Sequence, residues 1–170
     1  MEPGVRLQER CPRRVVFFCC YGGSHTSVIQ ACLHLGLLPL DPRPSYKQLI
    51  HLPHFDKVVK SEIGTPMFMG YDSWGRAVYT LGLGRGRKHL NELLGGLLGE
   101  IGVNPDQAKF FDCLSTASFL TRVGGFVSRG LGLTFLGRPL VVYSVMAGWP
   151  RFCELHRKIR AELESWGGDC

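Results

Sequence analysis

The segment that follows Cys20 carries residue types suited to binding an anion. Small and polar residues come directly after this cysteine: Tyr21, Gly22, Gly23, Ser24, His25, Thr26 and Ser27. Glycines let a backbone turn tightly and direct several N–H groups to one point. A helix that starts here adds free N–H donors and a partial positive charge. The backbone of Gly22 and Gly23 and the hydroxyl residues Ser24, Thr26 and Ser27 therefore form a predicted site for phosphate, sulfate or carboxylate.

Two side chains of this loop are candidate catalytic residues. Cys20 can act as a thiolate nucleophile at the positive end of the helix, and the expected reaction is then phosphoryl transfer. The alternative for Cys20 is a buried thiol at the end of a strand. His25 can serve as a general acid or base beside the anion, or it can be a solvent-facing residue on the first helical turn. Cys19 points to the other side of the strand and is expected in the core.

A second glycine-rich segment, GLGRGRK, concentrates cations. Arg85, Arg87 and Lys88 lie beside three glycines, and they could supply positive charge to the same anion if both loops share one edge of a sheet. The alternative is a solvated basic turn. The G-x-G-x-G spacing is not the dinucleotide fingerprint, so a nicotinamide cofactor is not expected. We predict no metal site, because no set of three or four convergent ligands is evident, and the sequence identifies no cofactor.

The first loop resembles two known loop types. Its spacing, cysteine, five residues, then Thr26 and Ser27, is similar to the C-x5-R-S loop of low-molecular-weight phosphatases and the C-x5-T-S loop of phosphotransferase IIB subunits. That resemblance implies a nucleophilic Cys20 and a phosphoryl group held by the loop amides. Thr26 stands where the phosphatases have arginine, so the guanidinium that stabilises their transition state is missing from this position.

The hydrophobic patterning predicts alternating strands and helices. A continuous apolar run at 14–20 is typical of a strand buried on both faces. Ser24 is expected to cap a helix that ends near Gly36, and Ser45 with Gln48 form a capping-box pattern. Further strands are expected at 66–71, 76–81, 109–114 and 138–145, and further helices at 45–51, 88–101, 116–131 and 150–163.

This order indicates a three-layer α/β/α, Rossmann-like domain with a mainly parallel sheet and one β-hairpin. We expect a single domain over residues 1–170, frayed at 1–13 and 165–170. Within the predicted helix at 116–131, Gly124 and Gly125 weaken the helix and can permit close approach of a backbone or ligand, with Arg122 or Arg129 reaching the site or lying on the surface.

Composition narrows the class of protein. The chain has 170 residues, 45% of them hydrophobic and 20% charged, with a net charge of +6; this is typical of a globular protein. Seven cysteines without a C-x-x-C pair argue against a disulfide framework and favour a reducing compartment.

No apolar run approaches the ~20 residues of a membrane helix, and no signal peptide is evident, so we expect a cytoplasmic protein that does not bind membranes. No nucleic-acid motif is present, and nucleic acid is not an expected partner.

Several segments together resemble one family. They are CCYGGSHTSVIQACLHLGLLP, LPHFDK, GYDSWGRAVYTLGLGR, RVGGFVSRGLGL and GRPLVV, within residues 15–160. They are similar to the domain-of-unknown-function family three-one-eight-nine of spore-forming bacteria, which implies no activity, cofactor or partner. The leading hypothesis from the residues is a site for a phosphorylated or other anionic small molecule. The alternative is a non-enzymatic regulatory or protein-interaction module, related to sporulation by the resemblance.

Overall fold

The computed structural model describes residues 14–57, 60–84, 96, 99, 104–130 and 133–166. Its described part contains a four-stranded sheet in the order β2-β3-β1-β4. These strands are β1 (Val15–Cys20), β2 (Met67–Tyr71), β3 (Ala77–Gly82) and β4 (Ala108–Asp112). β1 pairs in parallel with β3 and β4, and β2 pairs antiparallel with β3. The mainly parallel sheet with one hairpin is thus confirmed.

The central strand β1 is buried along its whole length, as its continuous apolar run predicted. Phe17 and Phe18 are both fully buried. The ring of Phe17 stacks between Tyr79 and Phe110 on the two neighbouring strands, at centroid distances of 5.4 and 4.6 Å. Cross-strand aromatic pairs of this kind fix the register of a sheet, and so they fix where the loop after β1 begins.

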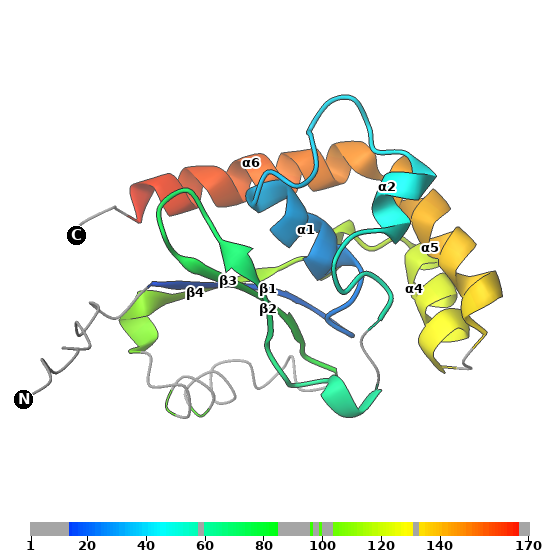
Figure 1. Ribbon diagram of the computed structural model, residues 1–170, viewed down its shortest axis with the longest axis horizontal. Coiled ribbons are helices and arrows are strands. Elements are labelled where there is room, and N and C mark those ends of the chain that lie inside the picture. Colours follow the sequence, from blue (N-terminus) through cyan, green and yellow to red (C-terminus); the bar gives the residue numbers. More distant parts are fainter. Residues whose placement is uncertain are drawn as a thin grey trace, which may run out of the picture.

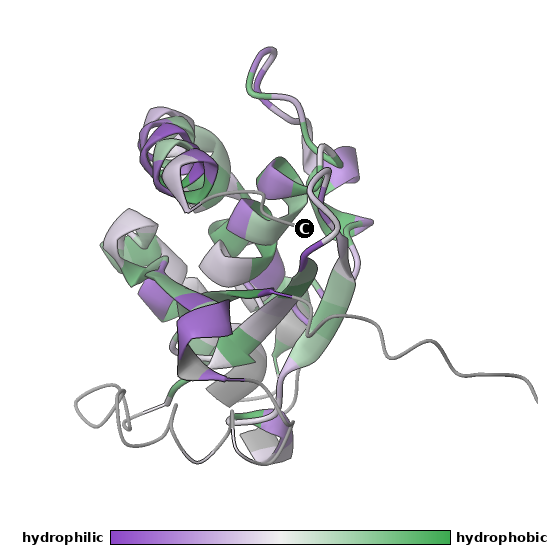
Figure 2. Ribbon diagram, turned by 90° about the vertical axis from the view of Figure 1, so that its left-hand side faces the viewer, coloured by the Kyte–Doolittle hydropathy of each residue, from purple (hydrophilic) through white to green (hydrophobic). Residues whose placement is uncertain are grey.

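Two helices cover one face of the sheet, α1 (Thr26–His34) and α6 (Trp149–Ser165) (Figure 1). Their apolar residues form a core with alternate residues of β1, and Figure 2 shows the hydrophilic residues of α6 on its outer side. The helical spacing of Val28, Ile29, Cys32 and Leu33 correctly predicted the buried side of α1. Within the described residues, no helix has the length and apolarity needed to cross a membrane.

Shorter elements complete the described chain. The capping box of Ser45 and Gln48 is present at the start of α2 (Tyr46–Ile50), as predicted. Single-turn 3-10 helices occur at Lys60–Glu62 (η1), Pro105–Gln107 (η3) and Leu114–Thr116 (η4). The helix expected at 88–101 lies outside the described residues, so a third layer stays a prediction, as does the single-domain boundary. α6 continues to Ser165, and Trp166 packs against Arg14.

The strand predicted at 138–145 is wrong, because this segment is helical. It belongs to α5 (Thr134–Ala147). This helix packs against α4 (Phe119–Gly125) and against η5 (Phe126–Gly130), a π-helical turn that continues α4. The three elements lie beside the carboxyl end of β1 (Figure 1). The helix expected from residue 116 therefore starts later, capped by Ser118.

Glycines explain why this β-branched segment forms a helix. A Cβ at Gly137 would overlap the backbone of Ser128 and Gly124, and a Cβ at Gly124 would lie 2.9 Å from Val141 Cγ2. The two helices therefore approach closely only because both positions lack a side chain. Tertiary packing at this crossing outweighs the β propensity of the valines and the cost of Pro139 inside the helix.

Candidate functional site

The loop after β1 packs directly against the loop after β3. Gly23 has φ +72°, and a Cβ there would lie 2.7 Å from the backbone nitrogen of Gly82. The N–H of Leu83 donates to the Cys20 carbonyl and that of Gly84 to the Tyr21 carbonyl, both at 2.8 Å. The two glycine-rich loops thus adjoin at one sheet edge. Arg85, Arg87 and Lys88, the predicted cations of the second loop, lie outside the described residues.

The sulfur of Cys20 sits in a polar environment at the base of the first loop. The N–H of Gly23 donates to Sγ at 3.2 Å, and the hydroxyl of Ser27 lies 3.1 Å from the same atom. Only 6% of the residue is exposed. An N–H group directed at sulfur stabilises negative charge on that atom. Cys20 is therefore a buried strand-end thiol that also has the hydrogen-bond partners of a thiolate.

The start of α1 is buried and has no side-chain cap. Ser24 was expected to be the cap, but that position belongs to His25, which makes no capping hydrogen bond, while the Ser24 carbonyl accepts from the N–H of Asp56 at 3.0 Å. In the part of the chain that the structure describes, the backbone N–H groups of Ser24, His25, Thr26 and Ser27 donate to no acceptor. Ser24, Thr26 and Ser27 are each at most 2% exposed. A buried helix end whose N–H groups have no acceptor among the described residues is a candidate site for an external anion.

His25 faces a buried carboxylate and not solvent. Its Nε2 lies 3.0 Å from Oδ1 of Asp56, whose side chain is fully buried. The Ser128 hydroxyl donates to both carboxylate oxygens at 2.9 Å, and Nε of Arg138 donates to Oδ2 at 3.0 Å. Burial acts to raise the pKa of Asp56, but His25, Arg138 and Ser128 together outweigh it and hold that pKa below its ordinary value. Asp56 is therefore a charged anchor that orients His25.

The Gly-Gly pair was predicted to permit close approach of a backbone or ligand, and the backbone of Gly137 lies close to Gly124, while Gly125 faces the ring of His25. A Cβ at Gly125 would lie 3.3 Å from His25 Nδ1, so only a glycine lets α4 pack against this ring without displacing it. Arg122, offered as a possible site residue, is exposed, and the side chain of Arg129 is not described.

Three residues of this cluster were not predicted from the sequence: Asp56, Ser128 and Arg138. Asp56 follows a loop with the left-handed residue His54 at φ 57°, and its own φ is 52°. Arg138 was assigned to a strand that does not exist. The outer side of Arg138 borders a hollow of about 230 Å³ that is lined also by Tyr46, Phe135 and Pro139. The sequence signal that could have identified Asp56 is its place as a lone aspartate in an apolar, histidine-rich loop. A carboxylate that is buried with such a loop needs hydrogen-bond partners from elsewhere in the chain.

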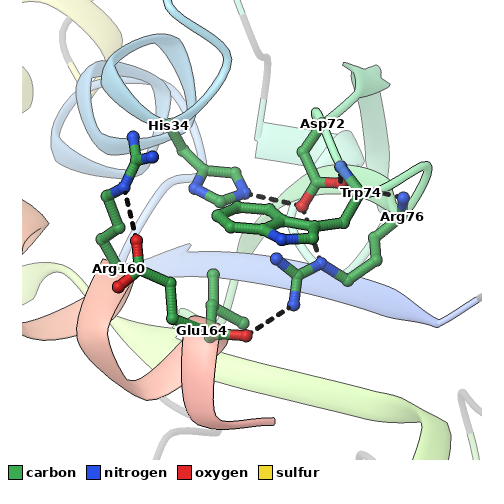
Figure 3. Close-up of polar contacts among 7 residues, drawn as sticks. His34, Asp72, Trp74, Arg76, Arg160 and Glu164 are labelled. Carbon is green, nitrogen blue, oxygen red and sulfur yellow. Dashed lines mark hydrogen bonds and ion pairs between the residues drawn. The ribbon is translucent and has the colours of Figure 1, made fainter. Parts of the chain in front are cut away.

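A second buried carboxylate, Asp72 of the hairpin turn, has a structural role. It accepts from His34 Nε2 at 2.9 Å and from Arg76 Nε at 2.8 Å, and Arg76 also donates to the Leu163 carbonyl at 3.0 Å (Figure 3). The Arg76 guanidinium lies 4.3 Å from the Trp74 ring centre. These contacts join the hairpin to α1 and α6. The backbone N–H groups of Trp74 and Arg76 donate to Oδ1 of Asp72, so both carboxylate oxygens have partners. Within the described ranges, no three His, Cys, Asp or Glu residues form a group that could hold a metal ion.

Comparison with protein families agrees with the motifs. The family model described as "Protein of unknown function (DUF3189)" matches residues 15–161. The chain belongs to the DUF3189 family. The matched span includes Cys20, His25, Asp56, Ser128 and Arg138, so the loop and the carboxylate cluster both lie within the DUF3189 region. No match was found among curated proteins or solved structures.

Proposed function

We propose that the loop from Cys20 to Ser27 binds a phosphate or phosphorylated small molecule. The observation that carries this proposal is the buried, uncapped start of α1, where four successive N–H groups from Ser24 to Ser27 are without an acceptor in the described chain beside the Cys20 sulfur. Donors in such an arrangement favour a compact anion with several oxygens over a neutral ligand. No acidic residue occurs in the loop, and the chain as a whole carries a net charge of +6.

The chemistry that this arrangement supports is phosphoryl transfer through Cys20. The Sγ atom attacks phosphorus, the bond to the leaving oxygen breaks, and that oxygen takes up a proton. Water then attacks phosphorus and breaks the S–P bond, which regenerates the thiol. The Gly23 N–H and the Ser27 hydroxyl stabilise the sulfur as an anion before and after the step. His25, oriented by Asp56, is the candidate proton donor.

Binding can be tested with inorganic phosphate and a matched pair of glycine variants. We expect phosphate to raise the melting temperature of the wild type and to give a saturable calorimetric signal. Gly23→Ala should abolish both effects, because its Cβ would overlap Gly82. Gly36→Ala is the control, since Gly36 has a similar φ of +70° but open space around it. Absence of a phosphate effect on the folded wild type, or equal effects on both variants, would contradict the proposal.

Catalysis needs a separate test with p-nitrophenyl phosphate as the probe. We expect slow hydrolysis by the wild type, its loss in Cys20→Ser, and its retention in Cys32→Ser, which replaces a buried thiol on α1. Phosphate binding that persists in a wild type without hydrolysis would limit the loop to a binding role.

A second candidate function is protein interaction through α4, η5 and α5. Large apolar side chains are exposed along this hairpin, and the four aromatic ones are Phe119 at 78%, Phe135 at 72%, Tyr143 at 66% and Phe126 at 63%. Residues 113–153 include no aspartate or glutamate, while Arg122 and Arg138 lie on these helices. An apolar surface whose own helices carry arginines and no carboxylate fits a protein with an apolar, acid-rimmed surface.

This interaction surface can be tested by crosslinking and affinity capture from cells, with Phe119→Ser/Phe135→Ser beside the wild type. We expect a specific acidic partner that the double variant loses. Gly23→Ala should retain that partner, because the loop is a different surface. Equal capture by the wild type and the double variant would contradict the assignment.

A further inference from the structure

Hydrogen bonding between β1 and β4 places Cys113 opposite Cys20. The register of the two parallel strands runs to the pair Cys19 and Asp112, and the Cys113 N–H donates to the Cys19 carbonyl at 2.8 Å. In a parallel ladder, a residue donates to the carbonyl that precedes its opposite residue, so Cys113 pairs with Cys20. Neighbouring strands lie about 4.8 Å apart, within the roughly 4.4–6.8 Å range between Cα atoms that a disulfide bridges.

The two thiols also lie on the same face of the sheet. Side chains alternate along a strand, and Val16 and Phe18 of β1 belong to the core cluster that contains Cys113. Cys20 continues that alternation. Cys19 belongs to the cluster on the opposite face with Val15 and Phe17. Of the two adjacent cysteines of β1, only Cys20 thus shares a face with Cys113.

The two thiols have different surroundings, which makes Cys20 the first to react and Cys113 the second. Cys113 is fully buried, and its Sγ donates to the Phe111 carbonyl at 3.5 Å. Burial raises the pKa of Cys113 well above its ordinary value, and electrostatic repulsion from the ionisable groups of Cys20, Cys19 and Asp112 raises it further. Cys113 is therefore held as a neutral thiol. Cys20 has the Gly23 N–H and the Ser27 hydroxyl at its sulfur and is the partner equipped to react first.

We propose that Cys20 and Cys113 form a redox pair that a peroxide oxidises to an intramolecular disulfide. The Cys20 sulfur attacks a peroxide oxygen, the O–O bond breaks, and the sulfur becomes a sulfenic acid while water leaves. The Cys113 sulfur then attacks the Cys20 sulfur, the S–O bond breaks, and the hydroxide leaves as water with the Cys113 proton. Two thiols are oxidised, one hydrogen peroxide is reduced to two water molecules, and a dithiol reductant reverses the change.

Disulfide formation has a consequence for the loop. In the disulfide, the Cys20 sulfur is bonded to a residue of β4 and is no longer available as a nucleophile. This regulatory part of the inference rests on the proposed function, whereas the disulfide itself does not. Oxidation would therefore switch off transfer through Cys20, and reduction would restore it.

The test is a disulfide map of the full-length wild type after treatment with hydrogen peroxide and then blocking of the free thiols. Trypsin separates the two sites, since residues 15–47 and 110–122 fall in different peptides. We expect these peptides to be linked in monomeric protein, with fragmentation placing the bridge at Cys20 and Cys113 and with two thiols lost per chain. A bridge through Cys19 or Cys32, links only between chains, or no thiol loss would overturn the proposal.

Cysteine variants test which residues form the disulfide. Cys19→Ala should still form the bridge, and Cys113→Ala should lose it, with circular dichroism confirming that each variant is folded. Phosphate calorimetry and p-nitrophenyl phosphate hydrolysis on reduced and oxidised wild type separate the two proposals. If the disulfide forms but the reduced protein neither binds phosphate nor hydrolyses p-nitrophenyl phosphate, the proposed function is contradicted. The redox pair would still stand. A bridge that leaves hydrolysis unchanged would overturn the regulatory role.

Discussion

At the scale of single residues, Asp56 connects the loop to the rest of the molecule. Its carboxylate contacts His25 at the position before α1, Ser128 of η5 and Arg138 of α5. A buried carboxylate that accepts hydrogen bonds from side chains of three separate segments is stabilised as an anion, and removing its charge leaves those partners unsatisfied. The orientation of His25 and the packing of α5 therefore depend on one ionised group.

We predict that Asp56→Asn lowers the free energy of unfolding at pH 7 by about 3 kcal/mol, the range for breaking a buried pair. Because the folded pKa of Asp56 is lowered, its contribution is fully present above the unfolded pKa of about 3.9 and is lost as the pH falls through the folded value. Urea unfolding from pH 7 to pH 3 measures both effects. Asp106→Asn, an exposed change, is the control, and a variant as stable and as acid-sensitive as the wild type would contradict this role.

At the scale of elements, the helical hairpin of α4 and α5 depends on glycine contacts. Gly124 and Gly137 lie at the crossing of the two helices, where neither tolerates a Cβ without a shift of the backbone or of Val141.

Local sequence correctly predicted β1, α1, α2, the β-hairpin, β4 and α6, because their patterns of apolar, capping and turn residues are local. It failed at α5, because the contact that makes this segment helical joins positions thirteen residues apart.

We predict that Gly137→Ala destabilises the protein, although Ala is favoured over Gly by about 1 kcal/mol inside a helix. The new methyl group would overlap Ser128 and Gly124, so steric cost reverses the sign. Gly96→Ala is the control, because Gly96 is also helical and has open space at its Cβ position. Thermal unfolding of both variants measures the difference. A Gly137→Ala protein with a melting temperature at or above that of the wild type would show that the crossing is not tight.

At the scale of the whole molecule, the candidate site combines a locally encoded loop with a cluster drawn from distant segments. The first loop could be predicted from sequence, since its glycines, hydroxyl residues and cysteine are contiguous and follow a recognisable strand. The cluster of Asp56, Ser128 and Arg138 could not, because its members are brought to His25 only by tertiary packing. Adjacent strands likewise bring Cys113 beside Cys20 through sheet order, which no spacing in the sequence reveals.

Binding of an anion by the N–H groups at the start of α1 can be followed residue by residue with amide NMR of the reduced, full-length protein. During a titration with sodium phosphate at constant ionic strength, we expect saturable shifts that are largest for the amides from Gly22 to Ser27. The amides at the start of α2, which Ser45 already caps, serve as the internal reference and should change little. Loop amides that do not shift, or shifts centred on the surface around Arg138, would show that the start of α1 is not the anion site.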